Sequence, residues 1–144
     1  FLKKEDNVLM LLRAKEPNKG KWNGVGGKIE HDETPYESCI REVLEETGLL
    51  LKTQTFRGMI ALNGAECINV FASNNFEGDL LSSDEGILEW KKLDWILSSK
   101  DVVPNIPFFI EDVLDFTSDP KVYNCSYSET GELTGVQVKL YQPI

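Results

Sequence analysis

The stretch that decides the fold runs from Gly26 to Leu49 and reads "GGKIEHDETPYESCIREVLEETGL". Thr34 is a favoured N-cap residue, Pro35 fits the first helical position, and Glu37 completes a capping box. Gly48 is a typical helix stop. The stretch therefore predicts a helix that begins after Thr34 and ends at Gly48. Its expected apolar face consists of Tyr36, Ile40, Val43 and Leu44.

The same helix carries three glutamates on one face. Glu42, Glu45 and Glu46 stand at i, i+3 and i+4, where like charges weaken a helix by about 0.2–0.5 kcal/mol per pair. A solvated acidic stripe is one explanation for this arrangement. The other is an all-oxygen site for a divalent cation such as Mg²⁺. The preceding glycines let the backbone approach closely, so the Gly26 carbonyl is a candidate further ligand.

Outward from this helix, apolar runs alternate with turn-rich segments. A second helix is expected at 108–116, and Asn63-Gly64 is a strong hairpin signal. The alternation of strands and helices predicts one mixed α/β or α+β domain over residues 1–144. Strands are expected at 6–13, within the glycine-rich stretch 25–33, and at 49–62, 66–73, 87–93, 121–128 and 135–142.

The bulk composition excludes some classes of partner. The 144 residues carry a net charge of −9, which argues against non-specific nucleic-acid binding. An anionic substrate is compatible with this charge if a bound cation supplies the missing positive charge. No apolar run is long enough to span a membrane, so no membrane partner is expected. The chain begins with Phe1, and we expect residues of the natural N-terminus to precede it.

The cysteines and the histidine restrict the chemistry further. Cys39, Cys67 and Cys125 are widely separated and lack metal-ligand spacing, which is typical of reduced cysteines in a cytoplasmic protein. His31 is the only histidine, so a histidine-based metal site is excluded.

Gly27, Glu33 and the segment 41–49 together follow the pattern G-x5-E-x7-R-E-U-x-E-E-x-G-U, where U is aliphatic. This is the Nudix box without a departure, and the sequence strongly resembles the Nudix hydrolases. The resemblance implies a mixed sheet between helices and a Mg²⁺ site that Mn²⁺ can also fill. It also implies cleavage of a nucleoside diphosphate linked to another group.

The resemblance assigns roles to the residues of the box. Glu42, Glu45 and Glu46 match its metal-binding and catalytic glutamates. Glu33 and Arg41 match a pair that orients the catalytic helix, although an ordinary surface ion pair is an alternative.

Residues outside the box are further candidates. Arg13 and Lys28 are candidates for phosphate contact, with simple solvation as the alternative. Family members often draw a further carboxylate from a later loop as a base or extra ligand. Glu85, with Asp84 beside it, fits that position, although acidic loop residues are usually just solvated.

The base-recognising residues are expected outside the box. "GKWNGVGGKIE" resembles the MutT-like enzymes that act on oxidised purine nucleotides, which assigns Asn23 a purine contact and Trp22 a structural role. "DVVPNIPFF" resembles the segment that supplies a base-reading amide or acid, here Asn105, although Asn before a helix is often only an N-cap. Val103 stands near a position where some relatives place a Trp. Two further aromatic residues are candidates for base stacking or, more simply, for the core: Phe108 and Phe76.

The leading hypothesis is a Mg²⁺-dependent nucleoside triphosphate pyrophosphohydrolase that acts on 8-oxo-dGTP-like nucleotides. It would release a monophosphate and pyrophosphate, and so remove damaged precursors before they enter DNA. The alternatives are a Nudix hydrolase for nucleotide sugars or dinucleoside polyphosphates, or a non-catalytic nucleotide sensor. The partner is a small nucleotide, and the chain is expected to be a monomer or a homodimer.

Overall fold

Helix α1 (Pro35–Thr47) begins and ends as the sequence predicts in the computed structural model, which describes residues 1–81 and 84–142. The Thr34 hydroxyl accepts from the Glu37 N–H at 3.1 Å, and the Glu37 carboxylate accepts from the Thr34 N–H at 2.9 Å. Gly48 adopts φ 80° and donates its N–H to the Leu44 carbonyl at 2.9 Å. Both predicted caps are therefore confirmed.

The predicted apolar face of α1 is only partly buried. Val43 is buried and Ile40 is half-buried, but Tyr36 is 48% exposed and Leu44 is 45% exposed. The face that packs is narrower than the sequence pattern, and it centres on Val43.

The contacts divide the chain into two units. The first consists of residues 1–54 and 73–103, and the second consists of residues 55–72 and 104–144. The elements of the first unit are α1 together with β1 (Lys3–Lys4), β2 (Asn7–Arg13), β3 (Trp22–Asn23), β4 (Leu50–Leu51), β7 (Phe76–Glu77), β8 (Gly86–Lys92) and α2 (Leu93–Ser98).

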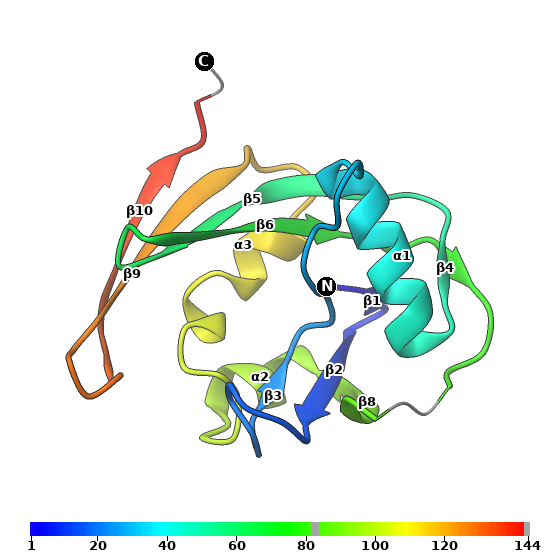
Figure 1. Ribbon diagram of the computed structural model, residues 1–144, viewed down its shortest axis with the longest axis horizontal. Coiled ribbons are helices and arrows are strands. Elements are labelled where there is room, and N and C mark those ends of the chain that lie inside the picture. The colour runs from blue at the N-terminus through cyan, green and yellow to red at the C-terminus, as the bar shows by residue number, and fades with distance from the viewer. Residues whose placement is uncertain (82–83, 143–144) are drawn as a thin grey trace. The chain divides into compact units, whose positions relative to one another are not determined.

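Strand β2 is the centre of the first unit's sheet (Figure 1). It pairs antiparallel with β8 along its whole length, and with β1 and β3 at its two ends. Residues 8–11 of β2 are all buried, as expected for a continuous apolar run. The pairing places the end of β2, Arg13, opposite Gly86 at the start of β8.

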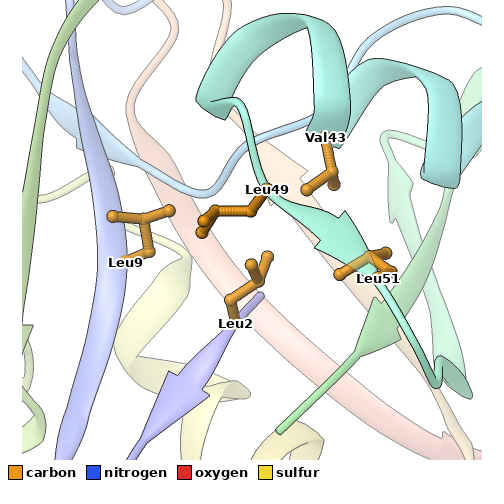
Figure 2. Close-up of a cluster of buried hydrophobic side chains, with 5 residues drawn as sticks. All are labelled: Leu2, Leu9, Val43, Leu49 and Leu51. Atoms are coloured by element: carbon orange, nitrogen blue, oxygen red, sulfur yellow. The ribbon is translucent and has the colours of Figure 1, made fainter. Parts of the chain in front are cut away.

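Five aliphatic side chains attach α1 to this sheet (Figure 2). They gather between α1, β2 and β4, and burying each leucine contributes about 1.5–3 kcal/mol. This cluster fixes the helix that carries the glutamates against the strands that follow and precede it. The residues are Leu2, Leu9, Val43, Leu49 and Leu51.

The second unit has a four-stranded sheet in the order β10-β9-β5-β6. The hairpin between β5 and β6 turns at Asn63 and Gly64, whose φ angles are 51° and 69°, so the predicted turn is confirmed. Strands β5 and β9 pair in parallel. The elements are β5 (Thr55–Leu62), β6 (Glu66–Ala72), the 3₁₀ helix η1 (Ile106–Phe108), α3 (Ile110–Leu114), β9 (Lys121–Tyr127) and β10 (Leu133–Leu140).

Several predicted elements are corrected. The short strand expected at the glycine pair lies earlier, at Trp22–Asn23, and the strand expected over 49–62 is interrupted into β4 and β5. The helix expected at 108–116 is shorter: η1 ends at Phe108, α3 covers Ile110–Leu114, and Phe109 between them has a non-helical φ of −133°. Helix α2 covers Leu93–Ser98, where the sequence patterns predict no helix. Ser82 and Ser83, which precede Asp84, lie outside the described residues.

The mixed α/β class is confirmed. Within residues 1–81 and 84–142, no helix is long and apolar enough to cross a membrane. The extent of a single domain over residues 1–144 stays a prediction.

Candidate active site

The three glutamates of α1 differ in their environment. Glu46 is only 8% exposed, and the Glu42 side chain is 16% exposed. The Glu45 side chain is 61% exposed. Helical geometry explains the difference, because the three positions share one face but point at different depths toward the protein. Glu46 and Glu42 therefore form the inner part of the acidic cluster.

The two glycines before the helix bring backbone against these carboxylates. The Gly26 N–H donates to Glu46 Oε2 at 3.2 Å. A Cβ atom at Gly27 would overlap the Glu42 carboxylate. Gly26 also has a φ of 155°, which favours glycine. The glycine pair is thus required for the close approach of this segment to Glu42 and Glu46.

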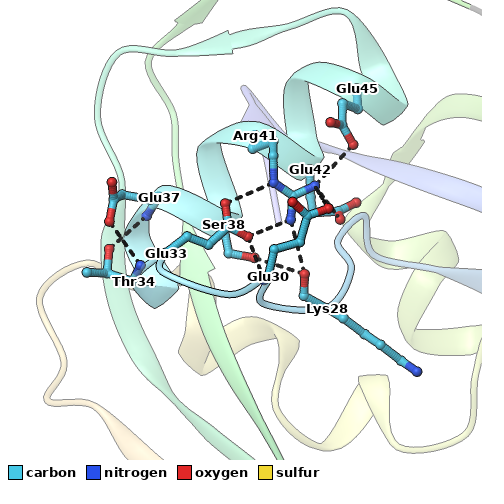
Figure 3. A network of polar contacts seen from close by, with 9 residues as sticks. All are labelled: Lys28, Glu30, Glu33, Thr34, Glu37, Ser38, Arg41, Glu42 and Glu45. Atoms are coloured by element: carbon cyan, nitrogen blue, oxygen red, sulfur yellow. Dashed lines mark hydrogen bonds and ion pairs between the residues drawn. The ribbon is translucent and has the colours of Figure 1, made fainter.

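Arg41 joins the glutamates into one network (Figure 3). Its Nε donates to Glu33 Oε2 at 2.9 Å and its Nη2 to Glu33 Oε1 at 2.6 Å. Its Nη1 donates to Glu42 Oε1 at 2.8 Å and to Glu45 Oε2 at 3.1 Å. A fifth bond, at 3.1 Å, goes to the Lys28 carbonyl. The guanidinium therefore holds the loop before α1 and two turns of α1 in one arrangement.

This pairing shifts the pKa values of both partners. The hydrogen bonds from Arg41, followed by the Glu30 N–H, lower the pKa of Glu33 to about 2. The hydrogen bond to Glu33 is likewise the main cause that raises the pKa of Arg41. Both groups are ionised at neutral pH. The structure thus brings Glu33 and Arg41 together, whereas the orienting role that the resemblance implies for them stays a prediction.

The buried Glu46 has the opposite shift. Burial is the main cause that raises the pKa of its carboxyl to about 7, and the nearby Glu42 and Glu85 charges act in the same direction. The Gly26 N–H and the Arg13 charge lower it. Glu46 therefore lies among carboxylates whose repulsion a cation would relieve.

The donor set fits a hard divalent cation in its chemistry. It consists of carboxylate and backbone oxygens, which Mg²⁺ and Mn²⁺ prefer. Over the described ranges, no three His, Cys, Asp or Glu side chains form a ready-made metal site. The reason is visible in Figure 3, where the Arg41 guanidinium bonds to Glu42 and Glu45 and supplies the positive charge. A bound cation would require these two carboxylates to turn toward it.

A second loop brings Glu85 to the cluster. The Ala14 N–H donates to the Glu85 carbonyl at 2.9 Å, beside the paired ends of β2 and β8. Its carboxylate is close enough to raise the pKa of Glu46. Lys15 Nζ lies 4.0 Å from Glu85 Oε1. Sequence reasoning missed Lys15, although its place two residues after Arg13 in the same loop is a signal that could have found it.

The two predicted phosphate-binding cations differ. Arg13 donates from Nε to the Pro17 carbonyl at 2.6 Å, and its charge acts on Glu46. Lys28 instead contributes its carbonyl, which accepts from Arg41 and, at 3.4 Å, from the Ser38 hydroxyl. Figure 3 shows the Lys28 side chain extending away from the carboxylates. The structure therefore favours Arg13 over Lys28 as a charge near the cluster.

The Trp22-Asn23 turn forms β3 in the first unit. Trp22 is buried, and its ring contacts Trp95 edge-on at a centroid distance of 6.1 Å. The Lys91 ammonium lies 4.4 Å from the centre of the Trp22 ring. Asn23 is half-buried, and its Oδ1 accepts from the Gly24 N–H at 2.8 Å. The packing of Trp22 fits the structural role expected of it and fixes the backbone next to Asn23.

Asn105 lies in the second unit, directly before η1. Asn105 occupies the N-cap position of η1, but its side chain makes no capping hydrogen bond. Its Nδ2 donates instead to the Tyr127 hydroxyl at 3.0 Å, and the residue is buried. Phe108 is 59% exposed, which contradicts the core interpretation for it. Phe76, in the first unit, stacks on Trp90 at 5.7 Å and is partly buried in the core there.

The NUDIX domain family matches residues 1–110. A Danio rerio protein named oxidized purine nucleoside triphosphate hydrolase is 34% identical over 107 residues, which cover 71% of this chain and 69% of that protein. A Mus musculus protein of the same name is 31% identical over 94 residues, 62% of this chain and 60% of its own length.

The fold resembles that of the mutator MutT protein from Bacillus halodurans. The two structures superpose with a TM-score of 0.82 at 28% identity, covering 96% of this chain and 93% of that one. The predicted Nudix fold is confirmed. Together with the family match over most of its length, this establishes that the chain belongs to the Nudix hydrolase family.

Proposed function

We propose that this Nudix hydrolase is a Mg²⁺-dependent pyrophosphohydrolase of oxidised purine nucleoside triphosphates such as 8-oxo-dGTP. The observation that carries the proposal is the inner carboxylate cluster. Buried Glu46 faces the charges of Glu42 and Glu85, with Arg13 as the opposing cation. A purely structural helix would have no need to bury a carboxylate among others.

The proposed metal ligands are the glutamates of α1, Glu42, Glu45 and Glu46, with the Gly26 carbonyl beside them. A bound Mg²⁺ would supply charge stabilisation to the transferring phosphoryl group and would lower the pKa of water. Glu33 and Arg41 hold α1 and its preceding loop in register, which keeps these oxygens on one side of the helix. The intact set of glutamates argues against a sensor that only binds nucleotides.

The substrate's charges need further partners. Arg13 is proposed to contact phosphate oxygens, and Lys15 joins it because it lies in the same loop and next to Glu85. Glu85 is proposed as the loop carboxylate that serves as a base or an extra ligand. Its carbonyl hydrogen bond to the β2 end supports this by holding the loop near Glu46.

Two amides are proposed to recognise the base. Asn23 and Asn105 each offer donors and an acceptor, which an oxidised guanine edge can match. Their assignment rests on the MutT-like resemblance, and the names of the Danio rerio and Mus musculus relatives support the same substrate class. The Asn105 side chain makes no capping hydrogen bond to η1, which also supports its assignment to base recognition. Phe108, with its exposed ring, is a candidate to stack on the base.

The experiment is a measurement of Mg²⁺-dependent pyrophosphate release from a panel of substrates. The panel holds 8-oxo-dGTP, dGTP, the other dNTPs, ADP-ribose and a diadenosine polyphosphate, each with and without a chelator. We expect release only with metal, and at least about a tenfold preference in kcat/KM for 8-oxo-dGTP over dGTP. Indiscriminate cleavage of dNTPs, or a preference for ADP-ribose or the dinucleotide, would refute the proposed substrate.

The remaining expectations about the whole protein stay predictions. These are its place in nucleotide-pool sanitation and DNA repair, its cytoplasmic localisation, and its state as a monomer or a homodimer.

A further inference from the structure

The buried Asn105 amide has an unexpected partner within its own unit. Asn105 stands before η1, but its side chain leaves the helix end unused and donates from Nδ2 to the Tyr127 hydroxyl at 3.0 Å. Asn105 is 8% exposed. A buried amide with one donor committed to a fixed partner has a defined orientation.

Tyr127 is itself held in place. It ends β9, and its N–H donates to Asn63 Oδ1 at 2.7 Å, in the turn between β5 and β6. The buried Cys125 thiol lies against both Asn105 and Tyr127, and burial raises its pKa, so it stays protonated at neutral pH. The hydrogen bond to Asn63 therefore fixes the end of β9, and with it the position of the Tyr127 hydroxyl that accepts from Asn105.

We propose that Tyr127 is a positioning residue, which fixes the orientation of the Asn105 carboxamide and thereby sets the purine preference of the enzyme. This inference rests on the proposed function, in which Asn105 contacts the base. A carboxamide presents oxygen on one side and N–H₂ on the other, so a half-turn exchanges acceptor for donor. The Tyr127 hydroxyl is also hydrogen-bonded to Cys125, whose own S–H donates to the Tyr123 carbonyl at 3.8 Å, so the Tyr127 O–H donates to the Cys125 sulfur. The hydroxyl oxygen is then left to accept from Asn105 Nδ2, which selects one of the two amide orientations.

The orientation matters because purine edges have opposite patterns. A guanine-type edge offers the O6 acceptor and the N1–H donor, whereas an adenine-type edge offers the N6–H₂ donor and the N1 acceptor. An Asn105 amide fixed by Tyr127 can match one of these patterns and not the other. An amide free to turn would match both, and the enzyme would discriminate less.

The test uses Tyr127→Phe, which removes the hydroxyl and keeps the ring. The substrates are 8-oxo-dGTP and 8-oxo-dATP, which carry the same oxidation and differ in their Watson–Crick edge. We expect the ratio of their kcat/KM values to fall about fivefold in Tyr127→Phe, the effect of one hydrogen bond. The change should lie in KM, with kcat for the preferred substrate within about twofold of wild type. Tyr141→Phe is the matched control, because its ring packs on Phe56 in the same unit, and its ratio should not change.

Asn105→Ala and the double variant separate this inference from the proposed function. If Tyr127 acts through Asn105, the double variant loses no more selectivity than Asn105→Ala alone. If Asn105→Ala loses selectivity and Tyr127→Phe keeps it, or if the two losses add, the inference is overturned and the proposed function stands. An equal fall in kcat for both substrates in Tyr127→Phe would also overturn it. If Asn105→Ala keeps the base preference of wild type, or if wild type itself shows no base preference, both the inference and the assignment of Asn105 are wrong.

Discussion

Two arginines of this chain are held in opposite ways. Arg41, on α1, directs its guanidinium at carboxylates, those of Glu33, Glu42 and Glu45. Arg57, on β5, is 3% exposed and directs its guanidinium at backbone oxygens. Its acceptors are the carbonyls of Val113 at 3.0 Å, Ser118 at 2.7 Å and Asp112 at 3.2 Å, with the Ser118 hydroxyl at 2.6 Å.

The difference suggests separate roles for the two arginines: Arg41 orients side chains, and Arg57 stabilises the fold. Arg57 donates to the buried Val113 carbonyl near the end of α3, where carbonyls lack intrahelical donors, so its loss removes the donor of that acceptor. Arg41 bonds to carboxylates that are charged and partly exposed, and solvent screening reduces what such pairs contribute to stability. We predict that its role is to arrange Glu42 and Glu45. Substitutions near Arg41 should therefore change activity, and substitutions near Arg57 should change stability.

Glu46→Gln should have the largest effect. It lies on α1 with Arg41, and we expect the substitution to lower activity and not stability. It removes the buried charge from the proposed cation site, and kcat should fall at least about 10²-fold. The unfolding midpoint should not fall, because the substitution also removes repulsion from Glu42 and Glu85. Steady-state pyrophosphate release and thermal melting measure the two quantities. A near-normal rate would refute the metal assignment of Glu46.

Arg57→Met should show the reverse pattern. We expect the free energy of unfolding to fall by about 2 kcal/mol, because at least one buried carbonyl loses its donor. Activity of the folded fraction should stay within about twofold of wild type. Urea denaturation measures the stability, and exposed Lys139→Met is the control, with a change within about 0.5 kcal/mol. Equal losses in the two variants would contradict the structural role of Arg57.

Arg41→Lys tests whether the geometry of Arg41 or only its charge matters, because lysine keeps the charge and lacks the planar guanidinium. Lysine cannot bond Glu33 through two nitrogens and reach Glu42 and Glu45 at the same time. We expect kcat/KM to fall about tenfold, as for other residues that orient metal ligands. The unfolding midpoint should stay within experimental error of wild type. A large loss of stability with normal turnover would make Arg41 structural, like Arg57.

Asp112→Asn should have the smallest effect, visible only in acid. Burial raises the pKa of Asp112, but hydrogen bonds from Lys121, Tyr123 and Ser118 outweigh it and lower the pKa below 3.8 overall. The ionised carboxylate therefore stabilises the fold above about pH 4, and this contribution is lost as the pH falls through the lowered pKa. The variant should show a shallower decline of the melting temperature below pH 4. An unchanged slope would exclude Asp112 as a source of acid sensitivity.

The sequence predicts what local chemistry determines. Thr34, Pro35, Glu37 and Gly48 fix both ends of α1 through contacts within a few residues, so the helix was predictable. The alignment of the glutamates on one face follows from their spacing. The meeting of Glu33 with Arg41 follows from their separation by about two helical turns.

Contacts between distant segments were not predictable in this way. Lys15 meets Glu85 because β2 pairs with β8, and Asn105 meets Tyr127 because η1 lies near the end of β9. Single-sequence patterns do not specify such pairings. Helix α2 was missed because it has six residues and no side-chain cap. The exposure of Leu44 was missed because periodicity marks an apolar face without showing how much of it is covered.

In the proposed function, the inner glutamates of α1 bind a divalent cation. Mn²⁺ binding followed by electron paramagnetic resonance tests it most directly, in wild type, Glu46→Gln and the exposed control Glu129→Gln. We predict that Glu46→Gln weakens binding at least about tenfold and that Glu129→Gln leaves it unchanged. Wild-type affinity in Glu46→Gln, or equal weakening in both variants, would contradict the claim.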